Sequence, residues 1–281
     1  MKETITLSNG IEMPKIGYGT YMTPPEKTRQ LVLQALRHGY RLIDTAQNYG
    51  NEKQVGQAIR ESGIKREEIF VTSKTQTSGY QNTKRGIERS LMETGLDYID
   101  LMIIHWPNQD NAGTYRALEE AFKEGKVRSI GLSNFNQEQT QKILDMAEIK
   151  PVINQIETHM SWQQEKMHRF LKDRGIVHES WSPFAEGADR IFENPVIQGI
   201  ARKHKKSPAQ IILRYLMDND VVVIPKTTRD SRMEENLNLF DFFLDEEDHR
   251  LLRSLDQGRS LFNWPAAMAS EEYPKRNRNR N

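Results

Sequence analysis

Short apolar runs alternate along this chain with longer polar segments. The runs are rich in β-branched and aliphatic residues, which is typical of buried strands. They begin near Ile16, Arg41, Ile69, Asp100, Val127, Val152, Ile176 and Val221. From residue 41 on, successive runs begin 24–31 residues apart, except that the last interval is 45 residues long. This spacing predicts eight strands that are separated by helices.

The polar segments have the periodicity of amphipathic helices. Within residues 28–37, for example, the apolar residues Leu31, Ala35 and Leu36 recur at helical intervals. The long last interval leaves room for an extra helix before the final strand. We expect a helix to begin there at Ser207, because serine caps helix N-termini and the proline that follows it favours a first helical turn.

The chain opens with a predicted β-hairpin. Thr4–Leu7 and Ile11–Met13 are short candidate strands on either side of Asn9 and Gly10. An Asn-Gly pair tolerates the positive φ angles of a tight type I′ turn, so we expect that turn here.

Strands that alternate with helices form βαβ units, and these place parallel strands between covering helices. Two architectures fit this pattern: an open doubly wound sheet and a closed barrel. An open dinucleotide-binding sheet is expected to carry G-x-G-x-x-G after its first strand, whereas Gly17-Tyr18-Gly19-Thr20 has no third glycine. The sequence therefore favours an α/β fold, a (β/α)8 TIM barrel with the N-terminal hairpin closing its bottom.

Composition and charge narrow the class of protein. The 281 residues include no cysteine, which excludes disulfides and thiolate metal sites. The 40 basic and 39 acidic side chains leave a formal net charge of +1, and residues 275–281 contain four of the basic ones and no acid. The rest of the chain is thus slightly acidic, which argues against nucleic-acid binding.

We expect one barrel domain over residues 1–274 and a disordered tail over 275–281. The chain has no apolar run long enough to span a membrane and no apolar N-terminal signal segment. We therefore expect a cytoplasmic protein, monomeric, with a small-molecule substrate and neither nucleic acid nor membrane as a partner.

Polar residues recur where the predicted strands end. Each has a plain alternative as a helix cap, a solvated end charge or a structural histidine, but the joint pattern is costly to bury unless the groups pair. In a barrel of this kind all of them fall at the C-terminal face, where such enzymes carry their chemistry. They are Asp44, Lys74, His105, Ser133, Asn134, Gln155, Glu157 and Lys226.

Asp44, Tyr49, Lys74 and His105 form a candidate catalytic set. An ammonium beside a tyrosine lowers the pKa of the phenol from about 10, and a carboxylate paired with that ammonium keeps it charged. The expected product is a tyrosine that exchanges a proton near neutral pH, with a histidine that hydrogen-bonds the substrate oxygen. This set suits carbonyl reduction, but the hydride must come from a cofactor.

Seven short motifs occur along the chain: GYGT (17–20), DTAQNYGNE (44–52), TSK (72–74), HWP (105–107), GLSNF (131–135), NQ (154–155) and IPK (224–226). Together they resemble the aldo-keto reductase family, from about residue 4 to residue 264, and the branch with diketogluconate reductases and prostaglandin-F-synthase-like enzymes in particular. The resemblance implies a barrel that binds NADPH, with Asp44, Tyr49, Lys74 and His105 as catalytic tetrad and Tyr49 as proton donor.

The same resemblance implies which residues bind NADPH (NADP+). Ser133, Asn134 and Gln155 match residues that hold the nicotinamide carboxamide, and Gly19, Thr20, Trp181 and Ser182 lie in matching motifs near it. Lys226, Thr227 and Arg232 match residues that grip the 2′-phosphate, and Glu235 and Asn236 match those at the adenine. A dianionic phosphate favours fixed cations, so we expect NADPH to be preferred over NADH.

Two features depart from the common family pattern. Trp181 stands where many members have a tyrosine that stacks on the nicotinamide, and tryptophan stacks at least as well. The segments after Pro107 and after Trp264 are short, so we expect an open, shallow substrate pocket with Tyr21 and Trp106 as its aromatic rim. The remaining histidines lack metal-ligand spacing, and we assign no metal.

Three functions remain in view. The leading hypothesis is an NADPH-dependent oxidoreductase that reduces small aldehydes and ketones to alcohols. A second is a regulatory subunit of the same fold that binds NADPH as a sensor. A third is an aldolase with Lys74 as Schiff-base lysine, which leaves the Ser133-Asn134 and IPK motifs unexplained.

Overall fold

The computed structural model describes residues 3–262, and these contain ten strands and ten α-helices. The strands are β1 (Thr4–Thr6), β2 (Glu12–Pro14), β3 (Tyr18–Gly19), β4 (Leu42–Asp44), β5 (Phe70–Thr75), β6 (Leu101–Ile104), β7 (Ile130–Ser133), β8 (Ile153–Glu157), β9 (Val177–Trp181) and β10 (Val221–Val223). The helices are α1 (Pro25–His38), α2 (Glu52–Glu61), α3 (Tyr80–Thr94), α4 (Asn111–Lys123), α5 (Gln137–Met146), α6 (Glu165–Lys172), α7 (Pro195–His204), α8 (Pro208–Asp218), α9 (Asp230–Leu237) and α10 (Glu246–Arg253). Three short 3-10 segments are η1 (Gln47–Tyr49), η2 (Arg66–Glu68) and η3 (Ala185–Glu193). The predicted tail over 275–281 lies outside the described residues.

Strands β3 to β10 form one parallel sheet in which each strand pairs with the next one along the chain. The sheet curls round until its two ends meet. There, Gly17 N donates to Val223 O at 2.8 Å, Gly19 N donates to Pro225 O at 3.2 Å, and Ile16 bridges Val223 in parallel. We refer to this closing contact between β3 and β10 as the seam. The predicted eight-stranded barrel is confirmed.

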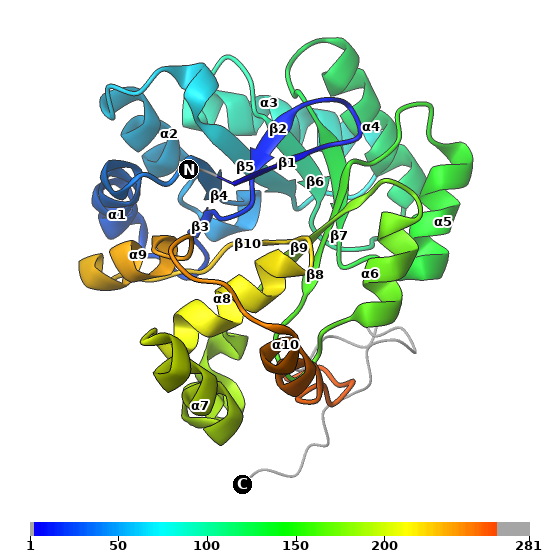
Figure 1. The fold of residues 1–281 in the computed structure, drawn as a ribbon. Coiled ribbons are helices and arrows are strands. Elements are labelled where there is room, and N and C mark those ends of the chain that lie inside the picture. The colour runs from blue at the N-terminus through cyan, green and yellow to red at the C-terminus, as the bar shows by residue number, and fades with distance from the viewer. Residues whose placement is uncertain (1–2, 263–281) are drawn as a thin grey trace, which may run out of the picture.

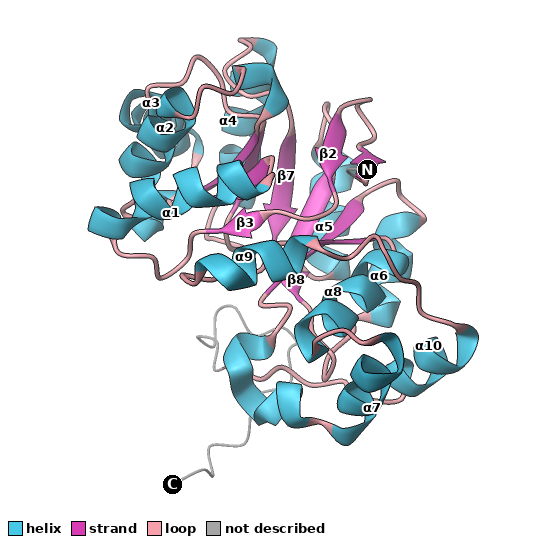
Figure 2. Ribbon diagram, turned by 60° about the vertical axis from the view of Figure 1, so that its left-hand side comes forward, coloured by secondary structure: helices cyan, strands magenta, loops and turns pink. Residues whose placement is uncertain are grey.

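Helices surround the strands, as Figure 1 shows from one end of the barrel. Figure 2 shows from the side that α7 and α10 lie beyond α8, away from the strands. The interval between β9 and β10 thus contains two helices, which confirms the predicted extra one. Ser207 caps α8 as expected: its hydroxyl accepts from Gln210 N, and the Gln210 side chain accepts from Ser207 N.

The hairpin β1–β2 lies across the N-terminal end of the barrel. Leu7 and Met13 are buried there in one cluster with inward-facing strand residues such as Leu101 and Val177. The hairpin therefore closes the bottom, but the predicted type I′ turn is wrong. Gly10 has φ +83° and its N–H donates to Leu7 O, whereas Asn9 is outside the positive-φ region.

This geometry is a three-residue loop in which only the glycine needs a left-handed conformation. Asn9 contributes a different interaction, because its side-chain amide donates to Arg128 O and to the Ser129 hydroxyl at 3.1 and 3.0 Å. The asparagine thus ties the hairpin to the segment that leads into β7, and the turn itself depends on Gly10.

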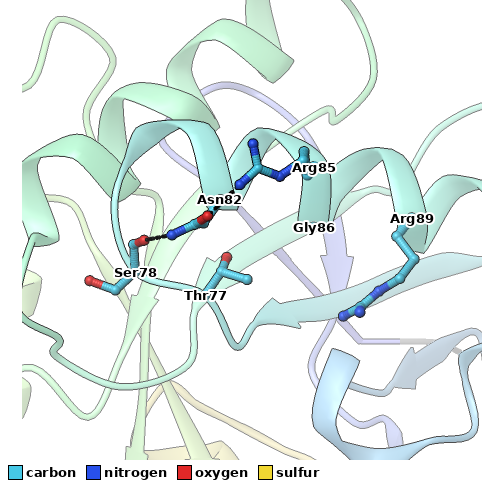
Figure 3. Close-up of a pocket in the computed structure, with 6 residues that line it drawn as sticks. All are labelled: Thr77, Ser78, Asn82, Arg85, Gly86 and Arg89. Atoms are coloured by element: carbon cyan, nitrogen blue, oxygen red, sulfur yellow. Dashed lines mark hydrogen bonds between the residues drawn. The ribbon is translucent and has the colours of Figure 1, made fainter.

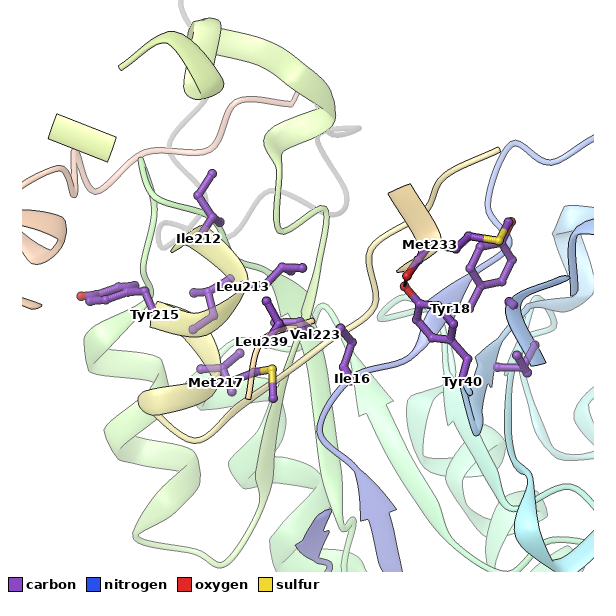
Figure 4. Packing of buried hydrophobic residues seen from close by; sticks show 14 of the residues in the cluster. Ile16, Tyr18, Tyr40, Ile212, Leu213, Tyr215, Met217, Val223, Met233 and Leu239 are labelled. Atoms are coloured by element: carbon purple, nitrogen blue, oxygen red, sulfur yellow. Dashed lines mark hydrogen bonds between the residues drawn. The ribbon is translucent and has the colours of Figure 1, made fainter. Parts of the chain in front are cut away.

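The outer core packs helices against the seam. Figure 4 shows side chains of α8, among them Leu213 and Met217, beside Val223 of β10 and Ile16 next to β3. Tyr18 and Tyr40 lie edge to face in the same cluster, with ring centroids 5.8 Å apart. Burial of apolar area on both sides of the seam stabilises the closed ring.

Within the described residues, no helix is long and apolar enough to cross a membrane.

Candidate active site

A buried ion pair lies inside the barrel near its C-terminal end. Lys74 on β5 is 0% exposed, and its ammonium lies 2.5 Å from Asp44 Oδ1 on β4 and 2.9 Å from Thr45 O. Burial acts to lower the pKa of Lys74, but Asp44, Tyr49 and Glu179 together outweigh it, and the net shift is upward. Lys74 is therefore a fixed cation at the floor of the barrel mouth.

Tyr49 reaches this cation from η1, the turn that follows β4. Lys74 Nζ donates to the Tyr49 hydroxyl at 3.4 Å and lies 4.9 Å from the centre of its ring. Burial raises the pKa of Tyr49 to about 12, although Lys74 acts to lower it. The expectation that this pKa lies near neutrality is wrong, because desolvation outweighs the charge of Lys74.

His105 follows β6 directly and faces Tyr49. The two rings lie edge to face with centroids 5.7 Å apart. Burial, with a smaller contribution from Lys74, lowers the pKa of His105 to about 3, so its imidazole is neutral at physiological pH. The four residues that the sequence grouped as a tetrad thus meet at one end of the barrel.

A second carboxyl group lies next to the tetrad, and sequence reasoning missed it. Gln155 Nε2 on β8 donates to Asp44 Oδ2 at 2.9 Å and to Glu179 Oε2 at 2.8 Å. Glu179 on β9 is 0% exposed, and burial, followed by the charge of Asp44, raises its pKa to about 8. A polar residue inside the apolar run IVHESW, two positions before Trp181, was the signal for it.

Asp44, Lys74, Gln155 and Glu179 form a buried polar layer, and glycines in the barrel wall make room for the apolar side chains next to it. A Cβ on Gly131 of β7 would lie 2.6 Å from Ile153 Cγ2, and one on Gly17 would lie 2.5 Å from Leu42 Cγ. Leu42 and Ile153, which these glycines accommodate, lie two positions before Asp44 and Gln155 on β4 and β8, and so one layer closer to the N-terminal end of the barrel.

Asn134 joins the ends of three strands. It has φ +63°, its amide donates to His105 O and to the Ser133 hydroxyl, and its Oδ1 accepts from Trp181 Nε1 at 2.8 Å. Ser133 in turn donates to Gln155 O at 2.8 Å. Ser133, Asn134, Gln155 and Trp181 therefore lie together beside the tetrad, as the sequence predicted.

The cationic residues of the IPK segment lie on the exposed side of the seam. Lys226, Arg229 and Arg232 are exposed, and within the described part of the chain none of them forms an ion pair. They follow β10 and surround the start of α9. A concentration of cations without carboxylate partners is typical of a phosphate site.

The other predicted cofactor residues take mixed positions. Gly19 lies in the seam, and Ser182 follows β9 directly with φ 50°. Thr20 is buried, and its hydroxyl donates to Asp44 O at 2.9 Å. Thr227 is buried, and its hydroxyl accepts from Arg229 N at 3.1 Å.

The two predicted adenine residues differ in exposure. Glu235 is half-buried and accepts from the Ser207 hydroxyl, whereas Asn236 is buried and hydrogen-bonded to Tyr40. Asn236 is therefore engaged in the core between α9 and the barrel.

Aromatic side chains line the rim of the mouth. Tyr21 is 51% exposed with its ring 5.1 Å from that of Tyr49, and Trp106 stacks on His105 at 6.2 Å. Phe262 packs on Trp181 with centroids 5.3 Å apart. The predicted rim residues therefore lie directly above the tetrad.

Glu157, which the sequence placed among the strand-end polar residues, does not join the tetrad. It is buried at the end of β8 and accepts from the Ser260 hydroxyl at 2.7 Å and from Leu261 N at 2.9 Å. Its carboxyl fixes the last described residues beside the mouth.

A pocket of about 310 Å³ lies along α3 and shares no residue with the tetrad or the predicted cofactor site. Figure 3 shows Asn82 between Ser78 and Arg85, donating to the former and accepting from the latter. Among the described residues no cluster of His, Asp and Glu could hold a metal ion. The tetrad at the mouth remains the group with reactive chemistry.

Comparison with known proteins connects this site to a family. A family-level sequence model described as Aldo/keto reductase family matches residues 15–257. The chain is 43% identical to the glyoxal reductase of Bacillus subtilis, over 92% of this chain and 94% of that protein. It is 37% identical to the methylglyoxal reductase DkgA of Yersinia pestis, over 96% and 99% of the two chains.

Solved structures agree with the sequence comparison. An aldo-keto reductase from a Medee basin deep-sea metagenome library superposes with a TM-score of 0.90 at 42% identity, over 92% of this chain and 97% of that one. A Bombyx mori aldo-keto reductase in complex with NADP superposes with a TM-score of 0.90 at 33% identity, over 98% of each chain.

Proposed function

Because this chain belongs to the aldo/keto reductase family, we propose that it is an NADPH-dependent reductase of small aldehydes and ketones with Tyr49 as proton donor. The observation that carries the proposal is the contact of the Tyr49 hydroxyl with the buried Lys74–Asp44 pair, beside a neutral His105. A phenol, a fixed ammonium and a neutral imidazole around one opening suit the reduction of a carbonyl group.

Tyr49 acts as a donor because it is fully protonated at neutral pH, with a pKa of about 12. An alkoxide that develops on the substrate oxygen is a far stronger base than a phenolate, so the proton moves to it readily. Lys74, at 3.4 Å, stabilises the phenolate that remains, and Asp44 keeps Lys74 in place.

His105 orients the carbonyl. Since its imidazole is neutral, it can donate one hydrogen bond to the substrate oxygen without supplying a competing acidic proton. The Trp106 ring that stacks on His105 and the Tyr21 ring beside Tyr49 limit the approach of the substrate to the gap between them.

NADPH, when bound, supplies the hydride that protein side chains cannot. The donor set of this chain fits it: Lys226, Arg229 and Arg232 are exposed cations without ion-pair partners in the described residues. Gly19 keeps the seam narrow there, because a Cβ on it would lie 2.8 Å from Ile224 O.

As substrates we propose small α-oxoaldehydes such as glyoxal and methylglyoxal. Two relatives that align over nearly their whole length are named for these compounds. We also propose that the protein acts as a monomer, without nucleic-acid or membrane partners.

Two measurements test this function. Tryptophan fluorescence is titrated with NADPH and with NADH, and NADPH oxidation is then followed with glyoxal, methylglyoxal and a panel of simple ketones. Saturation at lower NADPH than NADH, together with turnover of at least one dicarbonyl, is expected. Binding without turnover of any carbonyl would instead favour a sensor role, and absence of binding would remove the reductase function.

A further inference from the structure

Glu179 is the one buried carboxyl beside the tetrad that the proposed chemistry does not use, within the described residues. It is 0% exposed, its Oε2 accepts from Gln155 Nε2 at 2.8 Å, and its Oε1 has no hydrogen-bond partner. A buried carboxyl with an unsatisfied oxygen lowers the stability of the fold. Its presence in this layer therefore suggests a functional role.

The two carboxyl groups fix the orientation of the amide of Gln155. Its nitrogen lies between Asp44 Oδ2 and Glu179 Oε2, at 2.9 and 2.8 Å. The opposite orientation would place the amide oxygen against two carboxyl oxygens, which is electrostatically unfavourable. Both N–H groups are thereby engaged, and the amide oxygen is left to accept a hydrogen bond at the mouth.

The charges of the layer leave Glu179 un-ionised. Lys74 is the cation that acts on Glu179, and it lies directly on Asp44 at 2.5 Å. A second ionised carboxylate would face Asp44 across Gln155 without a cation of its own. The burial of Glu179 and the charge of Asp44 together raise its pKa to about 8, so the proton is retained at neutral pH.

The groups that face Glu179 from the neighbouring strands are few. Asp44 on β4 and Lys74 on β5 are the charged ones that act on it. β8 presents the uncharged Gln155, and β10 pairs with β9 through the apolar Val222. None of the other described strands contributes a cation that could pair with an ionised Glu179.

We propose that Glu179 is a positioning residue of the reductase: as a neutral carboxylic acid it anchors the amide of Gln155, so that the amide oxygen faces the nicotinamide carboxamide and fixes which ring face meets the substrate. This inference deepens the proposed function and rests on it. Ionisation of Glu179 at alkaline pH adds a negative charge to the layer beneath Tyr49 and makes its proton harder to release.

Two substitutions separate the anchor from the proton. Glu179→Gln keeps the acceptor for Gln155 Nε2 and cannot ionise, whereas Glu179→Leu removes the acceptor altogether. Glu52→Gln is the matched control, since Glu52 on α2 is also a buried carboxyl with a raised pKa and accepts from the Ser73 hydroxyl at 2.6 Å, outside this layer.

The first measurement uses the protein without cofactor. Urea unfolding of wild type and Glu179→Gln is compared from pH 5 to pH 9. Because folding raises the pKa of Glu179 from 4.5 to about 8, the folded state holds a proton that the unfolded state releases between these values. The stability of wild type relative to Glu179→Gln should therefore fall with rising pH up to about 8 and then stay level.

The second measurement concerns the nicotinamide. We expect Glu179→Leu to bind NADPH about tenfold more weakly, which corresponds to one lost hydrogen bond, and to transfer deuterium from both faces of NADPH labelled at C4. Glu179→Gln should keep wild-type affinity and transfer from one face, and its turnover should lack the decline near pH 8 that we expect of wild type. Glu52→Gln should behave as wild type in each respect.

Wild-type affinity and single-face transfer in a folded Glu179→Leu would overturn the anchoring role. A pH dependence of stability that is the same in wild type and Glu179→Gln would overturn the neutral carboxyl. If wild type itself turns over no carbonyl compound, the proposed function fails, and the unfolding comparison still decides the state of Glu179.

Discussion

Two opposing effects determine the pKa of Tyr49: burial of its hydroxyl and the positive charge of Lys74. Lys74 lies 3.4 Å from the hydroxyl and favours phenolate, but desolvation dominates and leaves the pKa at about 12. The residue is thus suited to giving a proton in the direction of reduction. At this pKa the proton moves only when a stronger base, the developing alkoxide, forms on the substrate, which confines proton transfer to the reacting complex.

Removal of this single hydroxyl should abolish most of the turnover. Tyr49→Phe is expected to lower kcat by at least about a hundredfold, since a general acid contributes that much or more, while NADPH affinity stays near that of wild type. Steady-state kinetics and fluorescence titration check both. Tyr98→Phe, which alters a ring stacked on Arg66 at 4.2 Å, removes a comparable hydroxyl and should keep full activity.

Titration of His105 should not affect the rate of reduction between pH 5 and pH 7. Its pKa of about 3 keeps the imidazole neutral, so kcat/KM for reduction should be level from pH 5 to pH 7. A decline below pH 6.5 that disappears in His105→Asn would contradict the neutral imidazole, because that decline would report protonation of an ordinary histidine.

At the scale of residues, the positions of most site residues could be predicted from the sequence, but their pKa values could not. Asp44, Lys74 and His105 were found because polar residues after apolar runs meet at one face of a barrel. Glu179 was missed because it lies within an apolar run and not at its end, so that only its two-residue spacing from Trp181 indicates which face it occupies. The pKa of Tyr49 depends on how deeply its hydroxyl is buried, and tertiary packing decides that.

At the scale of elements, the start of α8 could be predicted from the local sequence. Ser207 lies before a proline and three residues before Gln210, and the structure shows the reciprocal capping that this pattern favours. The type of the hairpin turn is harder to predict, since Asn9-Gly10 is compatible with more than one loop geometry. There the side chain of Asn9 bonds to Arg128 O, a partner 119 residues away that the local sequence does not reveal.

Loss of the cap on α8 should weaken the fold measurably. Ser207→Ala is expected to lower the free energy of unfolding by about 1 kcal/mol, since it leaves Gln210 N without its acceptor. Urea unfolding checks the value. Ser254→Ala, at the C-terminal end of α10, should cost less; an equal or larger loss there would mean that the cap on α8 carries no special weight.

Inside the barrel, an extra methyl group should be poorly tolerated. Gly131→Ala places a Cβ 2.6 Å from Ile153 Cγ2 and 2.9 Å from Ile153 O, and overpacking of this kind typically costs about 1–3 kcal/mol. Thermal unfolding reports the loss. Gly199→Ala on α7, where nothing lies within 4 Å of the added atom, is the control and should be neutral or stabilising.

Across the whole molecule, charge is nearly balanced, and the exposed cations Lys226, Arg229 and Arg232 after β10 form no ion pair within residues 3–262. Arg232→Ala should weaken NADPH binding at least about tenfold, in proportion to a lost charge-assisted hydrogen bond, and should leave NADH binding almost unchanged. Fluorescence titrations with both nucleotides provide the comparison. Equal losses would remove Arg232 from the 2′-phosphate site, and Arg202→Ala on α7 controls for the change in net charge.

The architecture as a whole was predictable because its signal is repeated eight times. Spacing of the runs gave parallel strands, and the incomplete glycine pattern at Gly17 and Gly19 favoured a barrel over an open sheet. The same two glycines form the seam, where they bond to Val223 and Pro225. Their role in closing the ring depends on the last strand, which local sequence around residue 17 cannot indicate.

The seam also sets an order of events during synthesis. It joins the first barrel strand to the last, and the Tyr18 hydroxyl that donates to Thr227 O across it has a partner 209 residues away. While the ribosome is still adding the middle of the chain, β3 has no neighbour on one side and its edge is open to other chains. The ring can be completed only once β10 has emerged, so the rate of elongation and access to chaperones bear on the yield of this protein.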